Sequence, residues 1–216
     1  MMKIPFFLKK IICEARLKFQ RALQCDFCEY HLFGFDTQKA LPKDAYIEMN
    51  QGCKLLDNTG VPYRLTDGTI LGIYREGRFI AHDNDIDVDV FDVERQQVDS
   101  IIKAFLNEGF KVGRRAYFKG VMHQVIFYNE REVIFDILFW YCDGDEYINN
   151  SERGYVRKQN ARYFNKLDEI SFQGNNYNTP PYIEEWLEMR YGKDWGTPKT
   201  YKGDWKDDCF DLEKIK

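Results

Sequence analysis

Several classes of protein are made improbable by what this sequence lacks. It has no internal repeat and no low-complexity tract. It has no excess of basic residues, since 31 Lys and Arg stand against 35 Asp and Glu, and the net charge of −4 argues against a nucleic-acid-binding protein. No secretory signal is visible, so we expect a cytoplasmic location with reduced thiols.

Closely spaced cysteines are also scarce. Of the six cysteines, only Cys25 and Cys28 are separated by two residues, and neither a second pair nor a histidine cluster completes a zinc site. We treat this pair as incidental and expect no zinc site.

The chain does contain enough apolar material for a core. Its 216 residues are 44% hydrophobic and 16% aromatic, which fits one domain with appendages. We expect an N-terminal helix over 1–24, a linker over 25–42, a catalytic domain over 43–198 and a charged tail over 199–216.

The first 24 residues are basic and amphipathic. Six Lys and Arg oppose only Glu14, and apolar residues recur at helical spacing, in runs far too short to span a bilayer. Such a helix can lie on an anionic membrane surface, which would make the protein peripheral on the cytoplasmic face. It can equally pack on its own domain or on a second subunit, and both interpretations stay open.

An acidic strand is the most informative stretch. Asp83, Asp85, Asp87 and Asp89 alternate with apolar residues toward the strand's end, so an extended chain would place the carboxylates on one face. A solvated edge strand is the plain alternative. Because the four anions repel one another, we favour a site for a hard divalent cation, Mg²⁺ or Mn²⁺.

A small-residue turn precedes this strand. Gly68 and Thr69 follow a predicted strand over 61–65 and open a predicted short helix over 69–74. A strand that ends in a glycine turn and opens a helix presents backbone N–H groups to an anion, and the Thr69 hydroxyl can donate as well. We therefore expect Gly68 and Thr69 to hold phosphate.

Together, the turn and the acidic strand resemble the core motif of the LicD/fukutin family of phosphotransferases. Two positions depart from the family pattern, which usually has Trp where this chain has His82 and Asp where it has Asn84. The matching positions are Gly68, Thr69, Leu71, Gly72, Arg75, Gly77, Ile80, Asp83, Asp85, Ile86 and Asp87. The resemblance implies an α/β fold with a nucleotidyltransferase-like mixed β-sheet flanked by helices.

Asp136 lies within an apolar run over 133–140, where an uncompensated carboxylate is costly to bury. A metal shared with Asp85 and Asp87 would compensate it, and the resemblance implies a third acidic residue at this place. The alternative is an ion pair with Arg114 or Arg115.

Other charged residues are weaker candidates. The resemblance makes Arg75 a ligand of the donor phosphate, and Arg78 is either a second ligand or a solvated charge. Asp83 or Asp89 is a candidate general base. The basic run from Arg153 to Arg162 would line a groove or form a solvated face.

Further helices are predicted over 43–58, 94–108 and 179–191, and strands over 110–118, 121–128, 132–140 and 167–172. The resemblance implies metal-dependent transfer of a phospho-group, phosphocholine or a polyol phosphate, from a CDP-activated donor to a hydroxyl of a cell-surface glycan or glycolipid. Two alternatives remain: a nucleotidyltransferase that moves a nucleoside monophosphate, and a non-catalytic nucleotide- or glycan-binding module.

Overall fold

The computed structural model describes residues 6–22, 26–199 and 205–215, and the structural statements below concern these residues. Cys25, one half of the closely spaced cysteine pair, lies outside them, as do parts of the predicted tail. Among the described residues, no helix has both the length and the apolar character needed to cross a membrane.

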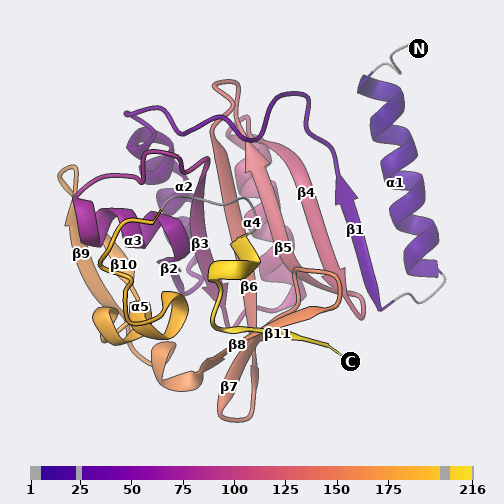
Figure 1. Ribbon diagram of the computed structural model, residues 1–216. Coiled ribbons are helices and arrows are strands. Elements are labelled where there is room, and N and C mark those ends of the chain that lie inside the picture. Colours follow the sequence, from indigo (N-terminus) through magenta and orange to yellow (C-terminus); the bar gives the residue numbers. More distant parts are fainter. Residues whose placement is uncertain (1–5, 23–25, 200–204, 216) are drawn as a thin grey trace.

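A mixed sheet organises the molecule (Figure 1). Its main path runs β1–β4–β5–β6–β7–β8–β11, and β3 and β2 branch from β6. The β3–β6 pair is parallel, whereas its neighbours are antiparallel. The strands are β1 (Phe27–His31), β2 (Tyr63–Leu65), β3 (Asp85–Phe91), β4 (Lys111–Phe118), β5 (Val121–Tyr128), β6 (Ile134–Asp143), β7 (Glu146–Asn149), β8 (Tyr155–Asn160) and β11 (Leu212–Lys214).

Helices flank this sheet, which confirms the predicted α/β class. A separate hairpin joins β9 (Asp168–Phe172) and β10 (Asn175–Thr179). The helices are α1 (Phe6–Ala22), α2 (Tyr46–Thr59), α3 (Asp67–Glu76), α4 (Arg95–Asn107) and α5 (Ile183–Tyr191).

One face of the sheet carries the main apolar core. Phe105 of α4 stacks on Phe127 of β5 with ring centroids 4.5 Å apart, and it also contacts Phe135 of β6. Gly52 lets α2 approach the Phe135 ring, which a larger side chain would overlap. Because side chains alternate along a strand, Asp136 points to the opposite face. Packing of α2 and α4 on the apolar face therefore fixes the strand that carries Asp136 on its other face.

Two of the expected appendages belong to the sheet. The predicted linker over 25–42 contains β1, which pairs with β4, and the predicted tail over 199–216 contains β11, which pairs with β8. Both predictions were wrong because these strands are short and carry charged residues, so they show little periodicity. The predicted helix over 69–74 also begins earlier, at Asp67.

Candidate active site

Adjacent strands bring three aspartates together. Asp87 of β3 lies opposite Asp136 of β6 in the parallel register, and Asp85 precedes Asp87 by two residues on the same face. One carboxylate oxygen from each of the three lies within 4.8 Å of the others. The structure thus brings together the three residues that the sequence suggested as metal ligands.

A hydrogen-bonded chain orients Asp136. Gln124 of β5 donates from Nε2 to Asp136 Oδ2 at 2.6 Å, and Arg114 of β4 donates in turn to Gln124 Oε1. Arg114 also forms an ion pair with Glu152 at 3.0 Å. Arg114 therefore reaches Asp136 through Gln124, and the direct ion pair considered as an alternative does not form. Asp136 Oδ1 is buried and accepts no hydrogen bond from the described residues.

The carboxyl groups of Asp83, Asp85, Asp87 and Asp136 are crowded together, and their negative charges are only partly compensated. Burial raises the pKa of Asp136 to about 7, and burial together with the nearby Asp67 charge raises the pKa of Asp83 to about 7. Burial and the neighbouring carboxylates raise the pKa values of Asp85 and Asp87 as well. An orphaned buried oxygen and a set of hard oxygen donors fit a divalent cation, so this cluster could bind a metal.

The start of α3 fixes the backbone of β3 at the site. β2 pairs with β3 only as far as Val88, and α3 then replaces it. Thr66 N–H donates to Asp87 O at 3.1 Å, and Thr69 Oγ1 accepts from Asp87 N–H at 2.8 Å. Thr69 is fully buried and is not among the residues that line the cavity. Its hydroxyl therefore does not face a bound phosphate, as expected from the sequence, but fixes the backbone of β3 at Asp87.

Gly68 is a point of close approach to Asp83. A Cβ atom at position 68 would lie 2.5 Å from Asp83 Oδ2, an oxygen that accepts no hydrogen bond from the described residues. Gly68 lines the cavity, and its lack of a side chain has a structural consequence. It allows the Asp83 carboxylate to sit against the first turn of α3.

Asp89 is separated from the other aspartates of its strand. Its carboxylate accepts from Arg64 Nε at 3.0 Å and from Trp140 Nε1 at 2.7 Å, and it is fully buried. Asp89 does not line the cavity. The expectation of Asp89 as a general base is therefore corrected to that of a partner in a buried ion pair.

The two predicted arginine ligands have different surroundings. Both pair with Glu76, at 2.6 Å for Arg75 and 3.1 Å for Arg78. Arg75 also donates to the Trp195 carbonyl at 3.1 Å and lines the cavity. The Arg78 side chain is 70% exposed and does not line the cavity, which favours the interpretation of Arg78 as a solvated charge.

Sequence reasoning missed a second charged cluster beside the aspartates, which we call the arginine clamp: Asp67, Arg157, Arg190 and Asp211. Arg157 of β8 donates to Asp67 at 2.7 and 3.0 Å and to Asp211 at 3.0 Å. Arg190 of α5 donates to Asp67 at 2.7 Å. Burial opposes ionisation of Asp67, but the two arginines outweigh it and lower the pKa of Asp67. The basic run that contains Arg157 was the only sequence signal for this cluster.

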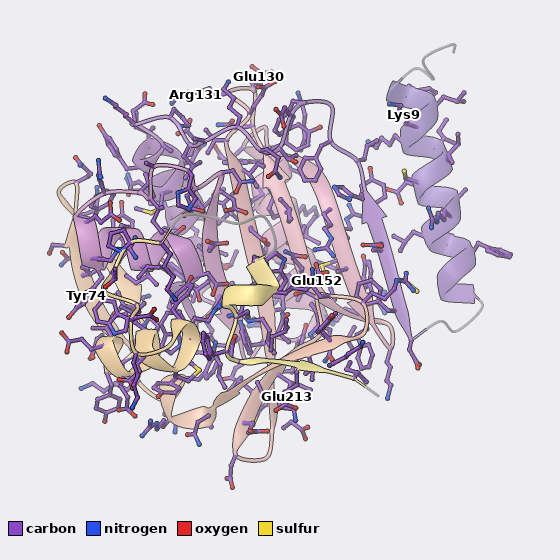
Figure 2. The ribbon with its side chains drawn as sticks, viewed as in Figure 1. Lys9, Tyr74, Glu130, Arg131, Glu152 and Glu213 are labelled. Carbon is purple, nitrogen blue, oxygen red and sulfur yellow. The ribbon has the colours of Figure 1, made fainter. Side chains whose placement is uncertain are left out.

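A cavity of about 570 Å³ joins these groups. This volume lies within the usual range of small-molecule sites. The three aspartates of the cluster line it, and so do three members of the arginine clamp, Asp67, Arg157 and Arg190. Its other lining residues include Arg75, His82, Tyr191 and Trp195. Glu152, labelled in Figure 2, is another of the residues that line this cavity.

Comparison with known proteins gives a consistent result. The family model described as LicD/FKTN/FKRP, nucleotidyltransferase domain, matches residues 60–181. The chain is 30% identical over 196 residues to ribitol-5-phosphate transferase FKTN of Macaca fascicularis and 29% identical over 196 residues to that of Homo sapiens. Each alignment covers 89% of this chain but 40% of that relative's length.

A solved structure also shows similarity. It is the lincomycin-bound crystal structure of the lincosamide antibiotic adenylyltransferase LnuA. The TM-score is 0.46 at 15% identity, and the match covers 69% of this chain and 86% of that chain.

Proposed function

Since the chain belongs to the LicD/FKTN/FKRP family, we propose that it transfers a phospho-group from a CDP-activated donor to a glycan hydroxyl. The relatives' name favours ribitol 5-phosphate, a polyol phosphate, over phosphocholine. The observation that carries the proposal is the convergence of Asp85, Asp87 and Asp136 in one cavity.

The three aspartates are the ligands we propose for Mg²⁺ or Mn²⁺. A bound cation would supply positive charge to the donor diphosphate and to the CMP leaving group. Gln124 holds the Asp136 side chain, and Thr69 holds the Asp87 backbone, so the ligands are oriented before any donor binds.

Donor binding falls to residues around the cavity. Arg75 presents the planar group suited to phosphate oxygens, and it lines the cavity together with Gly68 at the start of α3. The arginine clamp is a neutral network of two carboxylates and two guanidinium groups. We assign it the task of fixing the cavity wall rather than attracting the donor.

The proposed step is a displacement at phosphorus. The acceptor hydroxyl oxygen forms a bond to the phosphorus that carries the polyol, and the bond from that phosphorus to the CMP oxygen breaks. CMP leaves with the electron pair of that bond, and the hydroxyl proton passes to a carboxylate. Asp83 is the base we propose, because its unpaired oxygen lies beside Gly68 in the cavity wall.

The test is mass spectrometry of an oligosaccharide acceptor after incubation with CDP-ribitol, CDP-glycerol or CDP-choline and Mg²⁺. We expect the acceptor to gain a ribitol phosphate and CMP to be released. Asp136→Asn should abolish the gain, whereas Asp99→Asn, an exposed change on α4, should leave it intact.

Two other results would replace the proposal. A gain of CMP on the acceptor would indicate a nucleotidyltransferase. Nucleotide binding that ignores both EDTA and Asp87→Asn, with no product from any donor, would indicate a non-catalytic binding module.

A further inference from the structure

The amphipathic helix α1 turns its apolar side away from its own domain. At about 100° per residue, one group of side chains falls within an arc of about 100°. We call this group the α1 apolar stripe: Leu8, Ile11, Ile12, Ala15 and Phe19. The four large members are 46–65% exposed. Five of the eleven exposed large apolar side chains among the described residues lie on α1.

The opposite side of α1 attaches it to the sheet. Leu17 projects about 180° from the stripe and is only 4% exposed. Cys13 Sγ donates to His31 O at 3.7 Å, and Glu14 pairs with Arg115 at 3.9 Å. Figure 1 shows α1 standing alongside β1, at the edge of the sheet. The docking of α1 on its domain therefore leaves most of the stripe exposed, and only Ile12, itself 50% exposed, borders a groove that domain residues such as Phe33 also line.

Basic residues border the stripe. On the same helical projection, Lys9 and Arg16 follow one margin and Lys18 the other, and all three are exposed. Glu14 is the one acidic residue among the described side chains of α1. It lies on the side that attaches to the sheet and is paired with Arg115. An apolar stripe between two basic margins matches a lipid surface with anionic headgroups, because Lys and Arg can bury their stems and keep their charges at the headgroups.

We propose that α1 binds an anionic lipid surface through the apolar stripe, with Lys9, Arg16 and Lys18 at the headgroups. The protein has an overall net charge of −4, so attraction to anionic lipid must come from this local element. This inference does not depend on the proposed transfer reaction.

A second copy of the chain is a poorer occupant of the stripe. Two copies paired symmetrically through it would bring like-charged margins together around the contact. Repulsion between those margins would oppose the apolar gain, whereas anionic lipid would be attracted by them.

The test is sedimentation of the full chain with vesicles of phosphatidylcholine containing 0 or 30% phosphatidylserine as the probe. We expect binding to the anionic vesicles that salt weakens, and little binding to the neutral ones. The triple change Lys9→Gln, Arg16→Gln and Lys18→Gln should lower the partition coefficient by roughly a hundredfold, at about fivefold per charge. The matched control replaces the exposed residues Lys54, Lys103 and Lys111 by Gln and should bind as the original chain does.

A second pair of variants tests the apolar contribution. Ile11→Gln with Phe19→Gln should lower binding more than tenfold, whereas Ile47→Gln with Leu106→Gln, at similarly exposed positions on α2 and α4, should not. The basic variant keeps the test decisive if the stripe variant fails to fold. Equal binding of a variant and its control would overturn the proposal. A vesicle-independent dimer that the stripe variant dissociates would overturn it in favour of a second copy.

Discussion

Arg157 and Asp67, which lie 90 positions apart, form a two-point ion pair in the cavity wall, with N···O distances of 2.7 and 3.0 Å. Asp67 is the first residue of α3, and Arg157 belongs to β8. Thr69 of the same helix accepts a hydrogen bond from the backbone N–H of Asp87 on β3. Asp211, immediately before β11, accepts from the same guanidinium group. The C-terminal segment is therefore connected to α3 through two charged contacts, and Thr69 of α3 contacts the strand that carries Asp85 and Asp87.

This connection predicts that Asp211→Asn destabilises the protein although it touches none of the reacting groups. Asp211 is 6% exposed, and its loss leaves Arg157 and Arg190 with less compensating charge. Breaking a buried ion pair from one side costs about 3–5 kcal/mol in the free energy of unfolding. Urea unfolding followed by circular dichroism measures it. Glu213→Gln, which removes an exposed partner of Lys158, is the control and should change almost nothing. An equal effect of both variants would contradict the role of the clamp.

The same cluster predicts a loss of stability in acid. Burial opposes ionisation of Asp67 and Asp211, but Arg157 and Arg190 lower both pKa values below the ordinary value. A carboxylate with a lowered folded-state pKa contributes stability above its unfolded pKa of about 3.9, and that contribution disappears as the pH falls through the folded value. The difference in urea midpoint between the original chain and Asp211→Asn should therefore be constant from pH 7 to 5 and shrink below about pH 4. A difference that grows in acid would refute this.

The sequence was informative where chemistry and periodicity coincide. The alternation of Asp85 and Asp87 with apolar residues indicated a strand with one acidic face, and Asp136 stood out because its strand is otherwise apolar. The helix α4 was predictable from its apolar stripe and is closed at its start by a Glu94–Gln97 capping box.

The sequence was uninformative where a role depends on pairing between distant segments. Nothing local distinguishes Asp89 from Asp87, yet Asp89 meets Arg64 and Trp140 while Asp87 faces the cavity. Arg157 read as one member of a basic run, and only the β8–β11 pairing beside Asp67 makes it a buried residue. Short strands such as β1 and β11 depend on their partners in the same way.

Removal of metal should reveal the ligand set. A cation present at a hundred times its dissociation constant stabilises the folded state by about 2.7 kcal/mol. We expect Mg²⁺ or Mn²⁺ to raise the melting temperature of the original chain and of Asp99→Asn relative to EDTA. Asp87→Asn and Asp136→Asn should lose that increase. Retention of the full increase in both ligand variants would place the cation elsewhere.

Asp89→Asn should separate stability from metal binding. Asp89 and Arg64 are both fully buried, so the change should cost about 3–5 kcal/mol in the free energy of unfolding. The melting temperature should fall, but the increase given by Mg²⁺ should remain, because Asp89 does not line the cavity. Calorimetric titration below the melting temperature provides the direct measurement. Loss of Mg²⁺ binding by folded Asp89→Asn would return this residue to the metal site.

The contact between Gly68 and Asp83 gives the most specific prediction. A methyl group at position 68 would lie 2.5 Å from Asp83 Oδ2, so Gly68→Ala must displace that carboxylate. Misplacement of a catalytic group by about 1 Å can cost a hundredfold, and we expect kcat/KM to fall by about that factor. Gly60→Ala is the control: no atom lies within 4 Å of the added Cβ, so strain at its φ of 69° should lower stability but not activity. In an Asp83→Ala background the Gly68→Ala change should add almost nothing, because the displaced group is gone. Additive effects in this double-mutant cycle would show that Gly68 acts independently of Asp83.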